Sequence, residues 1–211
     1  MPINIAIDGP AGAGKSTVAK ALAKEMGYIY VDTGAMYRLL ALYLEENSLE
    51  FSKEVLKDFN IKQSGETFYL NGVDVSKKIR TNDISKKASD ISKIKEVREY
   101  MVDLQRKISK SHSVILDGRD ISTVVFPNAD FKIFLTASVE VRAKRRFLQD
   151  KTLSYDKILE DIQKRDYQDM NRKNSPLRIA KGATVIDTSQ MTKEQVIQKI
   201  ISLVKGGQNA L

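Results

Sequence analysis

The stretch IAIDGPAGAGKSTVAK, at Ile5–Lys20, decides the fold of this chain. It begins within an apolar run, Ile3–Ile7, and leads into a segment whose apolar side chains follow helical spacing as far as Met26. Between the two, Gly9–Ser16 matches the pattern G-x-x-x-x-G-K-[ST], which belongs between a strand and a helix. The stretch therefore predicts a strand, a phosphate-binding loop and a helix over Lys15–Met26.

The phosphate-binding loop predicts a nucleoside triphosphate as ligand. Its small residues let the backbone curl around phosphates with N–H groups pointing inward, and the helix N-terminus favours an anion. Lys15 is expected to reach the terminal phosphates, and Ser16 to place its hydroxyl on a bridging Mg²⁺ ion. The expected triphosphate-binding set is Gly9, Pro10, Ala11, Gly12, Ala13, Gly14, Lys15, Ser16 and Thr17. Within this set, a structural role is favoured for Thr17. Switches, ATPases and kinases share this loop, so it leaves the class of protein open.

Strand and helix patterns alternate after the loop. Gly27 ends the first helix and is followed by a strand pattern at Tyr28–Val31 and a helical pattern over residues 36–44. Later strand patterns lie at Ser113–Leu116, Phe131–Leu135 and Thr184–Ile186, and helical patterns at Asp83–Ser92, Val97–Ser109, Ser138–Gln149 and Ser154–Met170. Thr192 and Gln195 form a capping box that opens a final helix. Because parallel strands need long crossover connections, this order predicts an α/β fold with a doubly wound parallel sheet.

A small antiparallel insert interrupts the alternation. Short strand patterns at Asn60–Gln63, Thr67–Leu70 and Val73–Val75 are separated by Ser64-Gly65 and Asn71-Gly72. Both dipeptides are typical of hairpin turns, so a small antiparallel β insert is expected.

Composition narrows the class of protein without naming it. The chain has 211 residues, 42% of them hydrophobic, which suits one globular core with excursions. It has no Cys, no apolar run long enough to span a bilayer and no leader pattern, so we expect a soluble, unsecreted protein without thiolate metal sites. The formal charge of +8 indicates an anionic partner. Aromatic residues are sparse in the basic stretch from Glu140 to Lys181, which weakens the nucleic-acid interpretation.

Asp117 ends an apolar strand pattern that starts at Val114. In a P-loop protein, such a strand-terminal carboxylate supports Mg²⁺ through the waters of the metal. An ordinary turn at Asp117-Gly118 is the alternative, and the presence of the loop favours metal support. His112, the single histidine, precedes a strand pattern and is not expected to be catalytic.

Four segments together resemble the bacterial cytidylate kinase family, over essentially the whole chain. They are IAIDGPAGAGKSTVAK at Ile5–Lys20, DTGAMYR at Asp32–Arg38, DGRDISTVVFPNAD at Asp117–Asp130 and RDYQDMNR at Arg165–Arg172. The resemblance implies transfer of phosphate from MgATP to CMP or dCMP. It also implies one chain built from a core (about 1–32, 111–140 and 180–211), a monophosphate-binding region with an insert (about 33–110) and a short helical lid (about 141–179).

The resemblance implies a set of residues for the acceptor nucleotide. Asp120, Arg98 and Ser89 supply the hydrogen-bonding types that cytosine needs, since its N4 amino group wants a carboxylate and its N3 and O2 atoms want donors. The implied CMP-binding set is Thr33, Arg38, Ser89, Arg98, Arg119, Asp120, Asp169 and Arg172. The implied catalytic set is Lys15, Arg119, Arg165 and Arg172, and the metal set is Ser16 directly and Asp117 through water.

The segment Arg165–Arg172 also has a pattern of its own. On a helical rise, Arg165, Asp169 and Arg172 share one face at i, i+4 and i+7. By resemblance Asp169 binds the sugar hydroxyls and the two arginines bind phosphate as the lid closes; a surface ion pair is the alternative. One of Arg142, Arg145 and Arg146 is further expected to contact ATP, and the sequence does not choose among them.

The expected partners are ATP and CMP or dCMP, with no nucleic acid and no membrane, and the expected state is a monomer in the cytoplasm. Another small P-loop kinase, acting on UMP, AMP or shikimate, is the nearest alternative. A GTP-dependent switch or a nucleic-acid-binding ATPase is a further one, although the chain lacks the N-K-x-D element that reads guanine.

Overall fold

A computed structural model describes residues 2–149 and 151–208. The chain divides into two compact units, one of Met1–Tyr30 with Ser109–Leu211 and the other of Val31–Ile108. The elements of the first unit, with β2 running into the second, are β1 (Asn4–Asp8), α1 (Lys15–Met26), β2 (Ile29–Asp32), β6 (Val114–Gly118), η3 (Ile121–Val125), β7 (Phe131–Thr136), α5 (Val139–Gln149), α6 (Tyr155–Asn171), β8 (Thr184–Asp187) and α7 (Lys193–Gln208).

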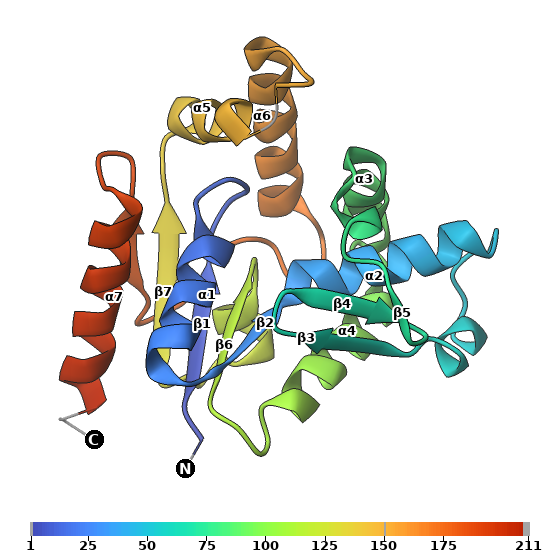
Figure 1. Cartoon of the computed structure of the whole chain (residues 1–211), viewed down its shortest axis with the longest axis horizontal. Coiled ribbons are helices and arrows are strands. Elements are labelled where there is room, and N and C mark those ends of the chain that lie inside the picture. The colour runs from blue at the N-terminus through green and yellow to red at the C-terminus, as the bar shows by residue number, and fades with distance from the viewer. Residues whose placement is uncertain (1, 150, 209–211) are drawn as a thin grey trace. The chain divides into compact units, whose positions relative to one another are not determined.

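The first unit contains a five-stranded parallel sheet in the order β2-β6-β1-β7-β8. β1 pairs in parallel with β6 and β7, and β7 with β8, so their carboxyl ends share one edge. Figure 1 shows α1 and α7 on one face of this sheet, and α5 with α6 beyond the carboxyl end of β7. The predicted α/β fold with a parallel sheet is confirmed.

The core of the first unit lies between the sheet and its helices. Ile5 and Ile7 of β1 are fully buried and pack in one cluster with Leu22 of α1 and Ile200 of α7. Burying each such aliphatic side chain contributes roughly 1.5–3 kcal/mol. This packing holds the carboxyl end of β1, where the phosphate-binding loop starts. A smaller cluster of Ala143, Ile158 and Ile162 joins α5 to α6.

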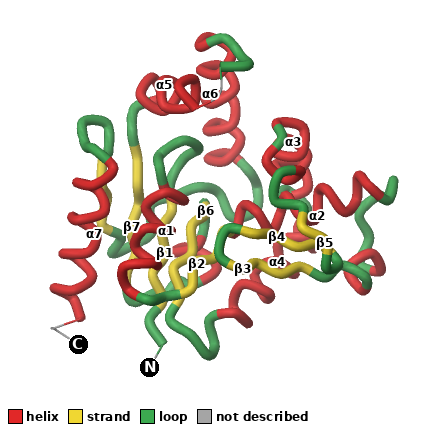
Figure 2. The backbone as a smooth tube through the Cα atoms, viewed as in Figure 1, coloured by secondary structure: helices red, strands yellow, loops and turns green. Residues whose placement is uncertain are grey.

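The second unit is built around α2. Its elements are α2 (Thr33–Glu46), η1 (Glu54–Lys57), β3 (Ile61–Ser64), β4 (Thr67–Leu70), β5 (Val73–Asp74), η2 (Lys78–Arg80), α3 (Asn82–Ile91) and α4 (Lys95–Ile108). The three short strands form an antiparallel sheet in the order β3-β4-β5, seen in Figure 2 as three yellow segments. The predicted antiparallel insert is confirmed.

The turns of the insert follow their sequence signals with one shift. Leu70 pairs with Val73, so Asn71-Gly72 is the predicted two-residue turn, and its positive φ angles of 47° and 83° suit the twist of a hairpin. The first turn lies one residue later than expected, because Ser64 pairs with Thr67 and leaves Gly65 and Glu66 as the loop.

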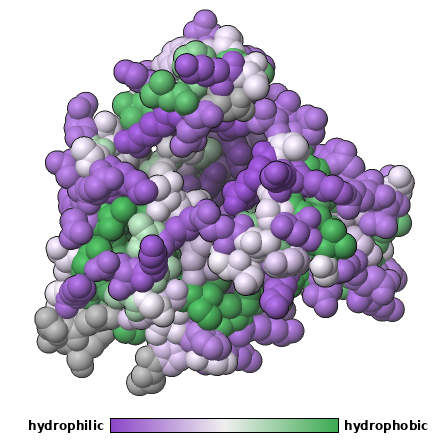
Figure 3. Space-filling model, viewed as in Figure 1, coloured by the Kyte–Doolittle hydropathy of each residue, from purple (hydrophilic) through white to green (hydrophobic). Residues whose placement is uncertain are grey.

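Local capping explains where several helices begin. The capping box of α7 forms as predicted, with Thr192 and Gln195 each accepting from the backbone N–H of the other. Ser154 caps α6 by accepting from the backbone N–H of Lys157. Among the described residues, none of the helices combines the length and apolar character needed to cross a membrane. The face in Figure 3 is mostly hydrophilic.

Candidate active site

The phosphate-binding loop leaves β1 at a position where only glycine fits. Gly9 has a φ angle of 148°, and a Cβ atom there would lie 1.9 Å from the backbone oxygen of Leu135 in β7. The loop thus lies directly against the neighbouring strand. Ala11 and Ala13 are buried, and Thr17, the last member of the expected set, is exposed on the first turn of α1.

Lys15 is buried at the start of α1, with 5% of its surface exposed. Its ammonium donates to the carbonyl of Pro10 at 2.7 Å. Burial lowers the pKa of Lys15, and the positive charge of Arg119 lowers it further, although the carboxylates of Asp117 and Asp169 work in the opposite direction. A bound anion would favour the protonated ammonium.

Ser16 and Asp117 meet at the edge of the sheet. The Ser16 hydroxyl donates to Oδ2 of Asp117 at 2.7 Å, and the Tyr30 hydroxyl donates to Oδ1 at 2.8 Å. Tyr30 was not among the predicted residues. A hydroxyl beside a carboxylate presents the hard oxygen ligands that Mg²⁺ prefers, so these residues fit the metal. The described residues contain no cluster of three or more His, Cys, Asp or Glu side chains suited to a metal ion.

Arg119, the residue directly after β6, forms a close ion pair with Asp169 of α6. Nε of Arg119 donates to Oδ2 of Asp169 at 2.7 Å. Burial opposes the charged form of Arg119, but Asp169 and Asp117 outweigh it and raise the arginine pKa. Burial alone would likewise raise the pKa of Asp169, but the charges of Arg119 and Arg165 lower it. Both groups therefore stay ionised at neutral pH.

Arg172 reaches this cluster, although the helical argument for it was wrong. α6 ends at Asn171, and Arg172 has an extended backbone with φ −64° and ψ 142°. The backbone N–H of Leu177 donates to the carbonyl of Asp169 at 2.8 Å. In a continuing helix this carbonyl would accept from an N–H group of the next turn, so the helix stops here. The Arg172 side chain nonetheless lies 3.5 Å from Asp120 and 4.0 Å from Asp169.

Asp8, at the end of β1, is a buried carboxylate that sequence reasoning missed. It is 0% exposed and accepts from the backbone N–H groups of Ile121 and Ser122, each at 2.8 Å, and from the Ser122 hydroxyl. Burial raises its pKa, and the three donors partly offset that effect. Asp8 thereby anchors η3 directly after Asp120. The only signal for Asp8 in the sequence was its place between a strand pattern and the glycine-rich loop.

Arg142 supports the loop from α5. Its guanidinium donates to the carbonyls of Ala11 at 3.0 Å and Ala137 at 2.9 Å, and forms a 2.6 Å ion pair with Asp166 of α6. Arg145 instead binds the hydroxyl and carbonyl of Thr188. These contacts tie the phosphate-binding loop to both helices of the expected lid.

In the second unit, Asp32 organises the start of α2. Its Oδ1 atom accepts from the backbone N–H of Ala35 at 2.7 Å, which caps the helix directly before Thr33. Its Oδ2 atom lies 3.2 Å from Nη2 of Arg38 and 3.2 Å from Nη2 of Arg80. Arg38 was a predicted site residue, whereas Asp32 and Arg80 were not.

Arg98 and Ser89 occupy neighbouring helices of the same unit. Arg98 of α4 is buried, donates to the carbonyl of Ser92 at 3.2 Å and lies 5.8 Å from the centre of the Tyr37 ring. Ser89 is half-buried on α3, and its carbonyl accepts from the Ser92 hydroxyl at 2.8 Å. Ser92 therefore connects the two predicted base-reading residues.

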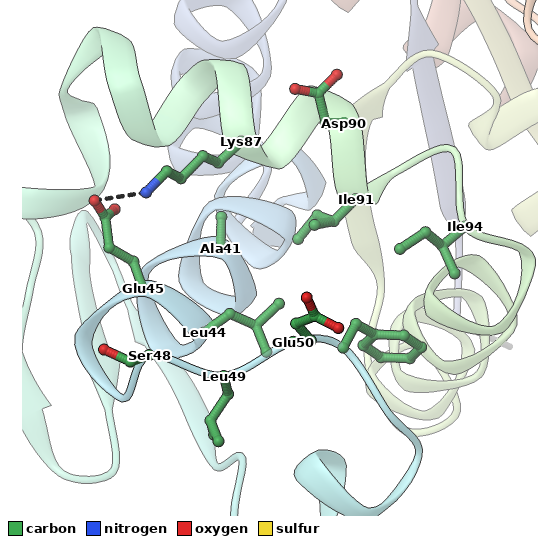
Figure 4. A pocket seen from close by; sticks show the side chains of 11 residues that line it. Ala41, Leu44, Glu45, Ser48, Leu49, Glu50, Lys87, Asp90, Ile91 and Ile94 are labelled. Atoms are coloured by element: carbon green, nitrogen blue, oxygen red, sulfur yellow. Dashed lines mark ion pairs between the residues drawn. The ribbon is translucent and has the colours of Figure 1, made fainter.

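A pocket of about 460 Å³ lies elsewhere in the second unit (Figure 4). The Glu45–Lys87 ion pair, at 2.7 Å, spans one side of it. Its lining residues, all within the described chain, are Ala41, Leu44, Glu45, Ser48, Leu49, Glu50, Phe51, Lys87, Asp90, Ile91 and Ile94. None of them belongs to the predicted site sets.

The loop, with an acid on the adjacent strand β6, places the protein among the P-loop phosphotransferases of the α/β class. The family model described as cytidylate kinase matches residues 5–206. A cytidylate kinase of Fusobacterium nucleatum is 53% identical over 94% of this chain and 95% of its own, and one of Caldanaerobacter subterraneus is 50% identical over 97% and 96%. The chain belongs to the cytidylate kinase family.

Solved structures of low sequence identity share the fold alone. An uncharacterized protein from Eubacterium ventriosum matches with a TM-score of 0.58 at 15% identity, covering 98% of this chain and 99% of its own. A gluconokinase from Sinorhizobium meliloti matches with a TM-score of 0.53 at 12% identity, covering 99% and 95%. A shikimate kinase from Acinetobacter baumannii matches with a TM-score of 0.50 at 16% identity, covering 98% and 94%.

Proposed function

We propose that the protein transfers the γ-phosphate of ATP to CMP or dCMP, giving ADP with CDP or dCDP. The observation that carries this proposal is the cytidylate kinase match over residues 5–206, supported by identity of about half to curated relatives over nearly their full length. The acceptor is already ionised at neutral pH, so no general base is required. Positioning and neutralisation of charge are then the chemistry that the residues supply.

The proposed donor site is the loop Gly9–Ser16. Its backbone N–H groups and Lys15 bind the triphosphate, and Ser16 with Asp117 would hold Mg²⁺ beside it. When bound, Mg²⁺ neutralises charge on the phosphate oxygens. The cations proposed to stabilise the transferring phosphoryl group are Arg119, Arg165 and Arg172.

The proposed acceptor residues are those that the family resemblance implies. Asp120, Arg98 and Ser89 read the base, and Asp169 binds the sugar. Arg38 binds near the phosphate, and Thr33 adds a hydroxyl near the nucleotide. The buried carboxylate of Asp120 favours cytosine over uracil, because uracil presents an acceptor where cytosine presents its amino group.

The proposal extends to the organisation of the chain. Residues of about 141–179 form the lid, about 33–110 the acceptor region, and the rest the core. In support, a separate apolar cluster packs the two helices of the proposed lid, α5 and α6, against each other. We further propose that the protein is a cytoplasmic monomer and that it acts on nucleotides without a nucleic-acid or membrane partner. Light scattering of the purified chain, which measures its molar mass in solution, tests the monomeric state.

A panel of acceptors tests the function. CMP, dCMP, UMP, AMP and shikimate are compared in an ATP-coupled assay of ADP release, with Lys15→Ala as the inactive control. The proposal expects CMP and dCMP to be turned over at least about tenfold more efficiently than the other acceptors. Rapid turnover of AMP or shikimate with none of CMP would overturn it.

A further inference from the structure

The insert of the second unit places a second guanidinium beside Arg38. Arg80 belongs to η2, the short helix that follows the antiparallel sheet, and its Nη2 atom lies 3.2 Å from Oδ2 of Asp32. Nη2 of Arg38 lies at the same distance from the same oxygen. The two nitrogens are therefore no farther apart than twice that distance, and one phosphate group can accept from both.

Asp32 holds both arginines from a fixed position. It is 3% exposed, and its carboxylate also caps α2 through the backbone N–H of Ala35. Its own backbone N–H donates to the Gln63 side chain of β3 at 3.2 Å. A buried carboxylate that is held this firmly fixes the guanidinium groups that it binds.

Arg80 has a second contact within the insert. Its guanidinium lies 5.3 Å from the centre of the Phe68 ring in β4, and Phe68 is fully buried. A guanidinium over an aromatic face is attracted to the ring while its N–H groups at the edge remain able to donate. The Arg80 side chain is 44% exposed, compared with 16% for Arg38, so solvent and ligands reach it more readily.

Two guanidinium groups, those of Arg38 and Arg80, bind the same carboxylate at the start of α2, where helix N–H groups also favour an anion. A phosphate dianion suits both features. We propose that Arg80 is a second binding residue for the phosphate of the acceptor nucleotide, supplied by the insert and positioned by Asp32 and Phe68. This inference rests on the proposed function.

The experiment compares Arg80→Ala with Lys77→Ala, an exposed cation in the same turn that removes the same charge. Arg80→Ala should raise the KM for CMP about tenfold or more, as expected for the loss of a charge-assisted hydrogen bond. The KM for ATP should stay within about twofold, and Lys77→Ala should resemble the unchanged protein. Arg80→Lys should fall between the two, because an ammonium keeps the charge without the planar fork.

A phosphate contact is separated from structural support by comparing two ligands. Calorimetric binding of CMP and of cytidine, which lacks the phosphate, is measured for each variant, with unfolding in urea recorded alongside. Arg80→Ala should weaken CMP binding and leave cytidine binding unchanged. Equal loss of both ligands, or CMP binding as strong as that of Lys77→Ala, would overturn the inference.

Failure of the proposed function would look different. The unchanged protein would then prefer another acceptor in the panel, whereas failure of the inference leaves CMP preferred and Arg80→Ala without a selective effect. If another nucleotide is preferred, the same comparison of nucleotide with nucleoside is made with that acceptor.

Discussion

The hydroxyl of Ser16 donates to Oδ2 of Asp117 at 2.7 Å, although 101 positions separate the two residues. This contact joins the first turn of α1 to the end of β6 and brings the two proposed metal-supporting groups together. Tyr30 holds the other carboxylate oxygen at 2.8 Å, so the orientation of Asp117 is set from two sides.

Asp117→Asn should raise the Mg²⁺ concentration needed for half-maximal activity by about tenfold, because the amide removes the negative charge that supports the ion. Titration of ADP release against Mg²⁺ at saturating ATP and CMP measures this. The exposed Asp103→Asn in α4 is the matched control. An unchanged Mg²⁺ requirement would remove Asp117 from the metal site.

Lys15→Ala should reduce the transfer rate by about a thousandfold or more, because the substitution removes the buried cation at the terminal phosphates. The ADP-release assay measures the rate, and the exposed Lys24→Ala of the same helix is the control. Activity within tenfold of the unchanged protein would contradict the role of the loop.

Asp120→Ala should lower the preference for CMP over UMP by roughly tenfold or more, the cost of losing a buried base-reading group. The KM for ATP should change much less. Ratios of kcat/KM for the two acceptors test this, and an unchanged ratio would exclude Asp120 from base reading. Because Arg172 lies 3.5 Å from Asp120, urea unfolding of the variant is needed to separate a loss of stability.

Asp169 predicts a pH dependence of stability. Its folded pKa is lowered from the ordinary 3.8, with burial opposed by the charges of Arg119 and Arg165. A lowered folded pKa means that its contribution is fully present above about pH 5 and is lost as the pH falls through the folded pKa. Asp169→Asn should therefore be less stable than the unchanged protein at pH 7, with a gap that narrows below about pH 5. Urea unfolding from pH 3 to 7 measures the gap, and a constant gap would contradict the assignment.

Asp8→Ala should destabilise the protein by about 2 kcal/mol or more, since the buried N–H groups of Ile121 and Ser122 lose their acceptor. Asp8→Asn keeps one acceptor oxygen and should lose less. Urea unfolding compares both variants with Asp103→Ala. Wild-type stability of Asp8→Ala would show that these donors find other partners.

Local patterns predicted the elements well, because strands, helices and turns depend on neighbouring residues. The bounds of α1 and β4 agree with the prediction, and the strands β1 and β2 are shifted by one residue. Arg172 shows the limit of such patterns. Local spacing placed it on a helix, but the helix ends at Asn171. The carbonyl of Asp169, in the last turn, accepts instead from the backbone N–H of Leu177. The assignment of each site residue to ATP, CMP or Mg²⁺ stays a prediction.

The sequence by itself determined the phosphate-binding loop, the α/β fold and the family, because each depends on residue types at short, ordered spacings. Only the tertiary structure decided which side chains hold the site residues: Tyr30 on Asp117, Asp8 beneath η3, Arg142 behind Ala11, and Asp32 between Arg38 and Arg80. These pairs are distant in sequence or come from separate elements. Their contacts exist because the packing of the sheet and helices brings buried charges together, where each charge needs a partner.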